Sequence, residues 1–416
     1  MVMTANDQAD PGATAYFARQ PLFDRTGAVV GYELLYRPTH TADAAYGADP
    51  EHMAAQVVAD AVLATDLAAA TDGTRAFLNA PRGLLTNPLL ESLDPGQIVI
   101  EILESVVPDG PVVEACTRLG ERGYVLALDD FAPDDARAPL LPFVSFVKVD
   151  VLGRSVDEVL QQAGPLTRME QLQLVAERVE TVEQYQSYAD AGFDLFQGFF
   201  FQRPELIAKR DLKPAQLGLI EALNLAGDER VSDHRIADHF KHDTALAYKV
   251  VRMANVAGLG ARNIHSVQHA IQLVGRDALS HWIALLLAAS YGRESGLRRE
   301  LLRTALVRSR MCELLGARLG PAASGHLFLV GLFSRLEALL SVPLADVLPR
   351  IALPAAAAAA LLRREGPYAG VLEAVDAYEA ADWERLARAG AAYSAAGLSH
   401  AYDQAVRWAD AVTRDI

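Results

Sequence analysis

The chain has 416 residues, of which 51% are hydrophobic, and a formal net charge of −15 at pH 7. A chain of this length and composition can bury a large core and is expected to form two domains rather than one. The negative charge and the lack of a long Lys and Arg run argue against direct nucleic-acid binding, since phosphate recognition depends on clustered basic side chains.

Residues 1–14 are expected to form a disordered tail before the first domain. They lack the basic and apolar regions of a signal peptide, and the apolar runs further along the chain are too short to cross a bilayer. Cys116 and Cys312 are far apart in sequence and fit neither a disulfide framework nor metal-ligand spacing. We therefore expect a cytoplasmic protein with no membrane anchor.

Seven short apolar segments alternate with helical segments between residues 15 and 206, which we predict to form the first domain. This alternation is typical of a parallel sheet. A closed barrel and an open doubly wound sheet are the alternatives, and we favour the barrel because no G-x-G-x-x-G loop follows the first strand. The predicted strands lie within residues 28–37, 75–80, 97–103, 124–130, 143–150, 173–180 and 193–201.

Each predicted strand carries a polar side chain near its carboxyl end, where the active site of a parallel barrel lies. Singly, each could be a salt-bridge partner or a turn cap. Together, their carboxylate and amide oxygens predict a site for Mg²⁺ or Mn²⁺, and two ions about 3.5 to 4 Å apart would suit attack on a phosphodiester. The residues are Glu33, Asn79, Glu101, Asp129 with Asp130, Lys148, Glu177 and Gln197.

The end of the fourth predicted strand and the segment after it are acidic and contain Asp129, Asp130, Asp134 and Asp135. Two ionised carboxylates about 4 Å apart repel by roughly 4 kcal/mol at an effective dielectric near 20, so a cation site and a solvated, helix-capping loop are the alternatives. The strand-end pattern assigns Asp129 and Asp130 to the cation site. Asp134 and Asp135 are interpreted as solvated or as a local N-cap.

Residues 207–416 are predicted to form an all-helical second domain. Apolar residues recur there at helical spacing, for example in residues 216–226, 281–290 and 303–319. The predicted fold class is therefore α/β plus all-α, with a TIM-like barrel followed by a helical domain.

The strand-end residues lie in motifs that resemble those of the EAL family of cyclic di-GMP phosphodiesterases. The resemblance implies a TIM-like (β/α) barrel that binds cyclic di-GMP with two Mg²⁺ or Mn²⁺ ions. It implies metal-binding roles for Glu33, Asn79, Glu101, Asp129 and Asp130, catalytic roles for Glu177 and Lys148, and ligand-binding roles for Arg37, Gln197 and Glu180. The matching motifs are ELLYR (33–37), FLNAP (77–81), EILES (101–105), LDDF (128–131), VKVD (147–150), AERVET (176–181) and FQGFFF (196–201).

The chain departs from active members of that family after the aspartate pair. They continue into a Gly-Thr-Gly-Tyr-Ser-Ser loop, whereas this chain has APDDARAPLLP (132–142), and Arg178 stands where glycine is usual. Three hypotheses remain open. The barrel binds cyclic di-GMP as a receptor, it hydrolyses cyclic di-GMP to linear pGpG, or it is an interaction surface whose acidic cluster binds neither metal nor nucleotide.

The helical half resembles the HDOD domain, a relative of HD-type phosphohydrolases, in residues 243–275 and in FLVGLFSRL (328–336). Active HD enzymes place a His-Asp pair where this chain has Ser334 and Arg335, and arginine cannot ligate a metal. The resemblance implies a non-catalytic domain that binds an unidentified protein partner, and the whole chain resembles the YuxH-type signalling proteins. A homodimer is a further expectation from the EAL resemblance.

Overall fold

The computed structural model describes residues 15–38, 67–132, 134–202, 212–241, 247–251, 266–290, 295–388 and 395–415. The chain divides into two compact units, one containing residues up to Arg25 and from Val29 to Gly198, the other containing residues 26–28 and those from Phe199 onwards. The predicted tail and the predicted boundary at residues 206 and 207 lie outside the described residues. Within the described ranges, no helix is long and apolar enough to cross a membrane.

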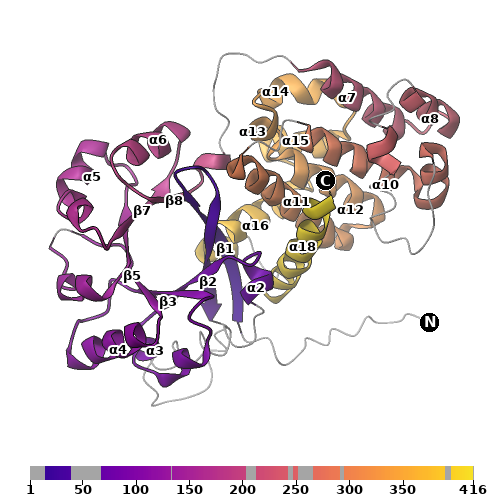
Figure 1. Ribbon diagram of the computed structural model, residues 1–416. Coiled ribbons are helices and arrows are strands. Elements are labelled where there is room, and N and C mark those ends of the chain that lie inside the picture. Colours follow the sequence, from indigo (N-terminus) through magenta and orange to yellow (C-terminus); the bar gives the residue numbers. More distant parts are fainter. Residues whose placement is uncertain are drawn as a thin grey trace, which may run out of the picture. The chain divides into compact units, whose positions relative to one another are not determined.

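Eight strands close into a barrel in the first unit, in the order in which they occur along the chain (Figure 1). β1 is antiparallel to both of its neighbours, β2 and β8, and all other neighbouring pairs are parallel. The barrel prediction is confirmed, but the expectation of a wholly parallel sheet is wrong at β1. The strands are β1 (Ala15–Asp24), β2 (Val29–Pro38), β3 (Arg75–Ala80), β4 (Ile98–Ile102), β5 (Val125–Leu128), β6 (Phe146–Asp150), β7 (Gln173–Val179) and β8 (Leu195–Gly198).

The seven predicted strands do not include β1. Its sequence, AYFARQPLFD, places Arg19, Gln20 and Pro21 in the middle of an apolar run, and a proline within a run counts against a strand. β1 nevertheless pairs with β2 along its length, with Gln20 opposite Glu33. The missed strand therefore lies beside one of the predicted site residues.

Helices on the outside of the barrel connect the parallel strands (Figure 1). The longest, α4 (Gly110–Glu121), starts where Oδ1 of Asp109 accepts a hydrogen bond from the Val112 N–H at 3.1 Å, as an N-cap residue does. Its buried side chains, at positions 112, 115, 116 and 119, recur at spacings of three and four residues and form one face against the sheet. The others are α2 (Leu67–Ala70), α3 (Arg82–Leu85), η1 (Pro88–Ser92), η2 (Ala138–Phe143), α5 (Val156–Ala163), η3 (Leu166–Arg168) and α6 (Val182–Asp190).

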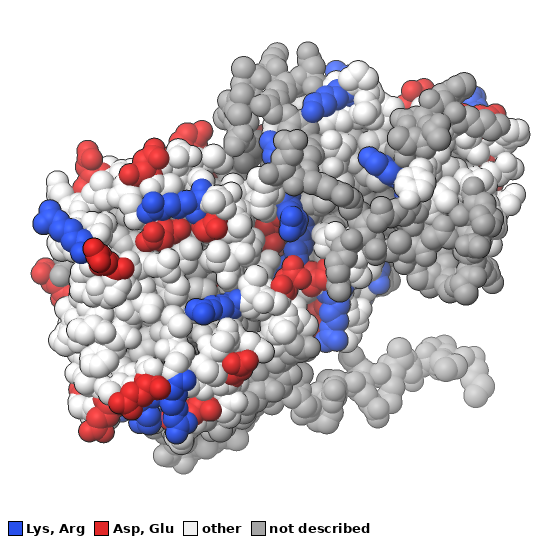
Figure 2. Space-filling view, in the orientation of Figure 1, with Lys and Arg blue, Asp and Glu red and all other residues white. Residues whose placement is uncertain are grey.

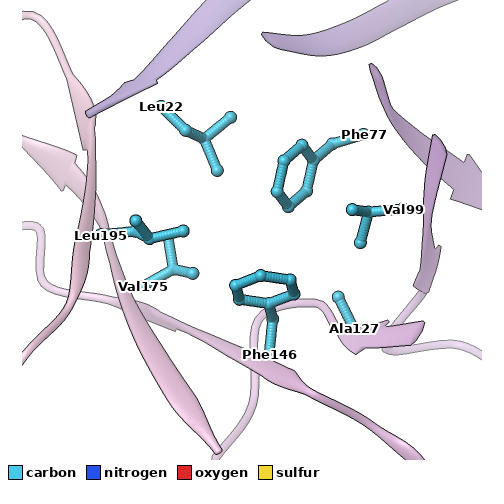
Figure 3. Packing of buried hydrophobic residues seen from close by; sticks show 7 residues of the cluster. All are labelled: Leu22, Phe77, Val99, Ala127, Phe146, Val175 and Leu195. Carbon is cyan, nitrogen blue, oxygen red and sulfur yellow. The ribbon is translucent and has the colours of Figure 1, made fainter. Parts of the chain in front are cut away.

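A layer of buried apolar side chains fills the interior of the barrel, and Figure 3 shows them pointing toward one another. The rings of Phe77 and Phe146 meet edge to face with centroids 5.7 Å apart. β2 contributes Gly31 at this level, where a Cβ would lie 2.7 Å from the Phe77 ring. The seven side chains, which we call the apolar layer, are Leu22, Phe77, Val99, Ala127, Phe146, Val175 and Leu195.

Replacing Gly31 by alanine should lower the free energy of unfolding of the barrel by about 1–3 kcal/mol, as overpacking of a filled core does. The added methyl group would meet both the Phe77 ring and the Arg75 carbonyl oxygen, 2.8 Å away. Urea titrations read by hydrogen exchange of β4 and β6 peptides would follow the barrel specifically. Gly120→Ala is the matched control, since nothing lies within 4 Å of that position in α4; equal losses in both variants would contradict the packing argument.

In the second unit, from residue 199 onwards, the described residues form helices joined by loops and no strand, which confirms the prediction for the second half. α11 packs against α12, α16 and α18 and is the central helix. All three tryptophans, Trp282, Trp383 and Trp408, lie in this unit, so tryptophan fluorescence reports on it and not on the barrel. Its elements are η4 (Phe200–Gln202), α7 (Pro214–Gly227), α8 (Asp233–Lys241), α10 (Val267–Ala289), α11 (Gly296–Gly316), η5 (Ala317–Leu319), α12 (Pro321–Phe333), α13 (Leu336–Leu340), α14 (Leu344–Val347), η6 (Leu348–Arg350), α15 (Ala355–Arg363), α16 (Ala369–Glu379), α17 (Trp383–Arg388) and α18 (Ala395–Asp415).

Candidate functional site

A polar layer lies next to the apolar layer, toward the carboxyl ends of β2 to β8. Along each of these strands, a predicted site residue follows a residue of the apolar layer, or Gly31, by two positions. Side chains of a strand alternate between its two faces, so residues two apart share the interior face. The pairs are Gly31 and Glu33, Phe77 and Asn79, Val99 and Glu101, Ala127 and Asp129, Phe146 and Lys148, Val175 and Glu177, and Leu195 and Gln197.

Lys148 lies at the centre of the polar layer and is the only lysine among the first 208 residues. Its side chain is 1% exposed and contacts four carboxylates, which come from β2, β4, the end of β5 and β7. One ammonium therefore faces four acidic groups, which leaves the cluster with an excess of negative charge if all are ionised. The distances from Nζ are 3.2 Å to Oε2 of Glu33, 2.9 Å to Oε1 of Glu101, 2.9 Å to Oδ1 of Asp129 and 2.8 Å to Oε1 of Glu177.

Side-chain amides hold the Glu33 carboxylate from both sides. Nδ2 of Asn79 donates to Oε1 of Glu33 at 3.0 Å, and Nε2 of Gln197 donates to Oε2 of Glu33 at 2.6 Å. The same Gln197 nitrogen donates to Oε1 of Gln20 at 3.0 Å. Gln20 was not predicted as a site residue, because β1 was not recognised as a strand. Its position opposite Glu33 follows only from the pairing of β1 with β2.

The cluster shifts the pKa values of its members in opposite directions. Burial raises the pKa of Glu101 well above its ordinary value, and burial raises the pKa of Glu177 to about 7 although Lys148 opposes the shift. Burial would also raise the pKa of Glu33, but the Lys148 ammonium and the hydrogen bonds from Gln197 and Asn79 outweigh it and lower the pKa. Burial lowers the pKa of Lys148, yet the surrounding carboxylates raise it well above its ordinary value.

The metal-free barrel should lose stability as the pH rises from about 5 to 8. A carboxyl group whose pKa is about 7 in the folded state and 4.5 when unfolded binds its proton more tightly when folded, so folding becomes less favourable as pH rises through that window. Glu101 adds to the same slope. Urea titrations in the presence of a chelator, read by hydrogen exchange of β4 and β6 peptides, should show a shallower slope in Glu177→Gln. An unchanged slope in that variant would contradict the assignment.

Three predicted site residues, Asp130, Glu180 and Arg37, are not among the carboxylates that contact Lys148 or the amides that contact Glu33. Asp130 and Glu180 follow Asp129 and Glu177 by one and three residues. Asp130 is exposed and has a left-handed backbone with φ 46°. Partial desolvation of its carboxylate, followed by the charge of Asp150, raises its pKa. The N–H of Glu180 donates to Oε1 of Gln184 at 2.9 Å. Arg37 pairs with Tyr16 in the sheet, and its side chain lies outside the described residues.

The backbone explains why glycine suits the position of Arg178. Arg178 has φ 57°, a left-handed conformation that glycine adopts without a steric penalty. Its guanidinium lies 2.6 Å from Oδ2 of Asp150, an ion pair that is largely exposed on the arginine side.

The loop after β5 differs from the expectation for Asp135. Asp134 is exposed as expected, but Asp135 forms an ion pair with the buried Arg137, with Nη2 2.5 Å from Oδ2. The interpretation of Asp135 as a solvated residue is therefore wrong: the carboxylate is 10% exposed and bound to a guanidinium. Arg137 was not predicted to have a role, because the burial of a loop arginine depends on tertiary packing that the local sequence does not reveal.

The second unit contains a buried cluster of arginines and acids at the predicted HD position. The Arg308 side chain of α11 is fully buried and contacts Asp376 at 2.6 Å and Glu379, both of α16. Nε of Arg308 donates to Oγ of Ser334 at 2.8 Å, and Arg335 lies 3.3 Å from Glu379. The carboxylates of Asp376 and Glu379 are therefore paired with arginine side chains and not grouped as ligands for a metal ion. The described part of this unit has no group of His, Cys, Asp and Glu arranged to hold a metal ion.

The barrel and its polar layer define an EAL-type domain, and comparison with known proteins agrees with this. Residues 13–204 match the EAL domain and residues 218–360 match the HDOD domain. The chain is 30% identical over 404 residues to the uncharacterized protein YuxH of Bacillus subtilis, covering 94% of this chain and 97% of YuxH. It is 32% identical over 379 residues to the cyclic di-GMP phosphodiesterase CdgJ of Vibrio cholerae, covering 89% and 86% of the two chains. The chain therefore belongs to the same family as YuxH, and in it the EAL match precedes the HDOD match.

A solved structure of BlrP1 from Klebsiella pneumoniae, in a complex with calcium and cyclic di-GMP, is similar to part of the chain. The sequence identity is 26% and the TM-score is 0.39. The match covers 49% of this chain and 58% of the BlrP1 chain. The predicted family and the predicted order of the two domains are confirmed by the domain matches.

Proposed function

We propose that the polar layer of the barrel binds two divalent cations, Mg²⁺ or Mn²⁺, together with cyclic di-GMP, and that the HDOD half binds protein partners. The observation that carries the proposal is the convergence of four carboxylates, from β2, β4, β5 and β7, on the single ammonium of Lys148. A buried excess of negative charge is costly unless a cation or a proton neutralises it.

The donor set fits a hard divalent cation. Carboxylate and amide oxygens are the ligands such ions prefer, and two of these oxygens, Oδ1 of Asn79 and Oε2 of Glu101, are buried without a hydrogen bond. The carboxylates contact Lys148 and are not arranged around a vacant point: across the described residues, no three His, Cys, Asp or Glu side chains form a metal-binding group. Binding therefore requires side-chain rearrangement around Lys148. The proposed ligands are Glu33, Asn79, Glu101, Asp129 and Asp130.

Electrostatics indicate that nucleotide binding depends on the cations. The phosphates of cyclic di-GMP are negatively charged, and an acidic polar layer repels them until cations neutralise it. Arg37, Gln197 and Glu180 are the proposed nucleotide-binding residues. On the face drawn in Figure 2, the visible basic and acidic side chains are interspersed and do not form a broad basic band.

Hydrolysis to linear pGpG is the second candidate function. Bound divalent ions would activate water and stabilise charge on the phosphate. Glu177 has a pKa of about 7, which suits a group that accepts a proton near neutral pH. Lys148 contacts the Glu177 carboxylate at 2.8 Å and would hold it in place. The 32% identity to CdgJ supports this candidate.

The experiment is incubation of the full chain with cyclic di-GMP and Mg²⁺ or Mn²⁺, with chromatography of the products and a calorimetric binding titration in parallel. Product that disappears in Glu33→Ala and with EDTA would establish hydrolysis. Metal-dependent binding without product would establish a receptor. Glu114→Ala, an exposed acid of α4, is the control and should behave as the unchanged protein. Unchanged metal and nucleotide affinity in Glu33→Ala would refute the proposed site.

The same experiment tests the non-catalytic status of the HDOD half. Ser334, Arg335 and the buried Arg308 support this status, since guanidinium groups occupy the position where HD enzymes hold a metal. Any product that persists in Glu33→Ala would contradict it. A homodimer and a cytoplasmic location stay predictions, and sedimentation of the full chain measures the first.

A further inference from the structure

Arg137 lies at the end of the loop that joins β5 to η2. Its side chain is buried, and every nitrogen of its guanidinium donates a hydrogen bond. Nη1 donates to the Ile102 carbonyl at 2.8 Å, and Nη2 donates to the Asp129 carbonyl at 2.7 Å. Nε donates to Oδ1 of Asp135 at 2.9 Å, and the Arg137 N–H donates to the same oxygen at 2.7 Å. The side chain is 1% exposed. Arg137 thus joins the carboxyl ends of β4 and β5 to the loop.

The two carbonyls belong to the backbone that carries three proposed metal ligands. Ile102 directly follows Glu101, and the second carbonyl is that of Asp129 itself. The Asp129 N–H also donates to the Ile102 carbonyl, at 3.1 Å. Next along the chain, Asp130 has φ 46°, a strained conformation for a residue other than glycine that persists only where the surroundings fix it.

The Asp135 carboxylate allows a buried arginine to lie beside a proposed cation site. It neutralises the guanidinium, so the pair fixes the backbone without adding net positive charge beside a cation site. The planar guanidinium can bind two carbonyls and a carboxylate at the same time, whereas a lysine ammonium is a single point charge without that fork.

Resting on the proposed function, we infer that Arg137, oriented by Asp135, is a positioning residue for the metal-binding carboxylates Glu101, Asp129 and Asp130. Groups that orient metal ligands without touching the metal commonly change metal affinity by about 10-fold to 100-fold when they are replaced.

The test is Mn²⁺ binding to the full chain, measured by the loss of the electron paramagnetic resonance signal of free Mn²⁺. Arg137→Gln and Arg137→Lys should each weaken binding by about tenfold or more, and Asp135→Asn should weaken it less. Arg118→Gln should bind as the unchanged protein does, because Arg118 pairs with Glu91 on the outside of the barrel. Hydrogen exchange of β4 and β6 peptides checks that each barrel is folded.

The outcomes separate the inference from the proposed function. If the unchanged protein does not bind Mn²⁺, the proposed function fails and the inference fails with it. If it binds and a folded Arg137→Gln binds equally well, the inference alone is overturned. Full affinity in Arg137→Lys would also overturn it, since a buried positive charge would then suffice. If Arg137→Gln does not fold, Asp135→Asn decides: weakened binding supports the inference and unchanged binding overturns it.

Discussion

Lys148→Met is expected to lower the free energy of unfolding of the metal-free barrel by about 3–5 kcal/mol, the loss typical of removing one partner from a buried ion pair. Methionine has a similar length, so the change removes charge rather than volume. The four carboxylates that contact the ammonium would then face one another in a site where Glu101 and Lys148 are almost fully buried.

Urea titrations in a chelator, read by hydrogen exchange of β4 and β6 peptides, measure this loss without a contribution from the helical unit. Arg82→Met is the control, because the ion pair of Arg82 with Asp109 is more than a third exposed at both ends and such pairs contribute about 0–1 kcal/mol. Mn²⁺ should restore more stability to Lys148→Met than to the unchanged protein. A loss as small as that of the control would contradict the account of the cluster.

Arg308→Met is expected to lower the free energy of unfolding of the helical unit by a similar amount, about 3–5 kcal/mol. Arg308 is fully buried between Asp376 and Glu379, whose side chains are 16% and 11% exposed. Burial alone would lower the pKa of Arg308, but the two carboxylates outweigh it and raise the pKa. Removing the guanidinium leaves two acids on α16 with a weaker set of partners.

Tryptophan fluorescence during urea unfolding measures this effect, since all three tryptophans lie in the helical unit. Arg407→Met is the control, because its pair with Asp403 is exposed on α18. Adding Glu379→Gln to Arg308→Met should recover part of the loss, because it removes one of the two largely buried acids that have lost the Arg308 guanidinium. If the double variant is less stable than Arg308→Met by the full effect of Glu379→Gln alone, the two residues are not coupled and the explanation fails.

The sequence allowed the barrel and most of its polar layer to be predicted, for a physical reason. Seven strands are short apolar runs that end in a polar residue, and a parallel barrel brings such ends together. This is why Glu33, Glu101, Asp129 and Glu177 could be expected around Lys148. β1 was missed because Arg19, Gln20 and Pro21 interrupt its apolar pattern, and Gln20 was missed with it.

The loop after β5 shows where sequence reasoning ends. Asp135 and Arg137 are two residues apart, a spacing found in many solvated loops. Their burial depends on the Ile102 and Asp129 carbonyls, which are brought to Arg137 by the barrel and not by the local sequence. Likewise, nothing in the helical periodicity of α11 indicates that Arg308 points inward to α16.

The apolar layer fills the barrel interior on the amino-terminal side of the polar layer. Phe77 and Phe146 are in edge-to-face contact, and the Phe77 ring lies close to Gly31 of β2, so the buried apolar layer separates Lys148 from the amino-terminal ends of the parallel strands. We therefore expect ligands of the polar layer to enter and leave at the carboxyl ends of β2 to β8. A nucleotide seated there would cover the ions beneath it, so cation exchange should wait for the nucleotide to depart.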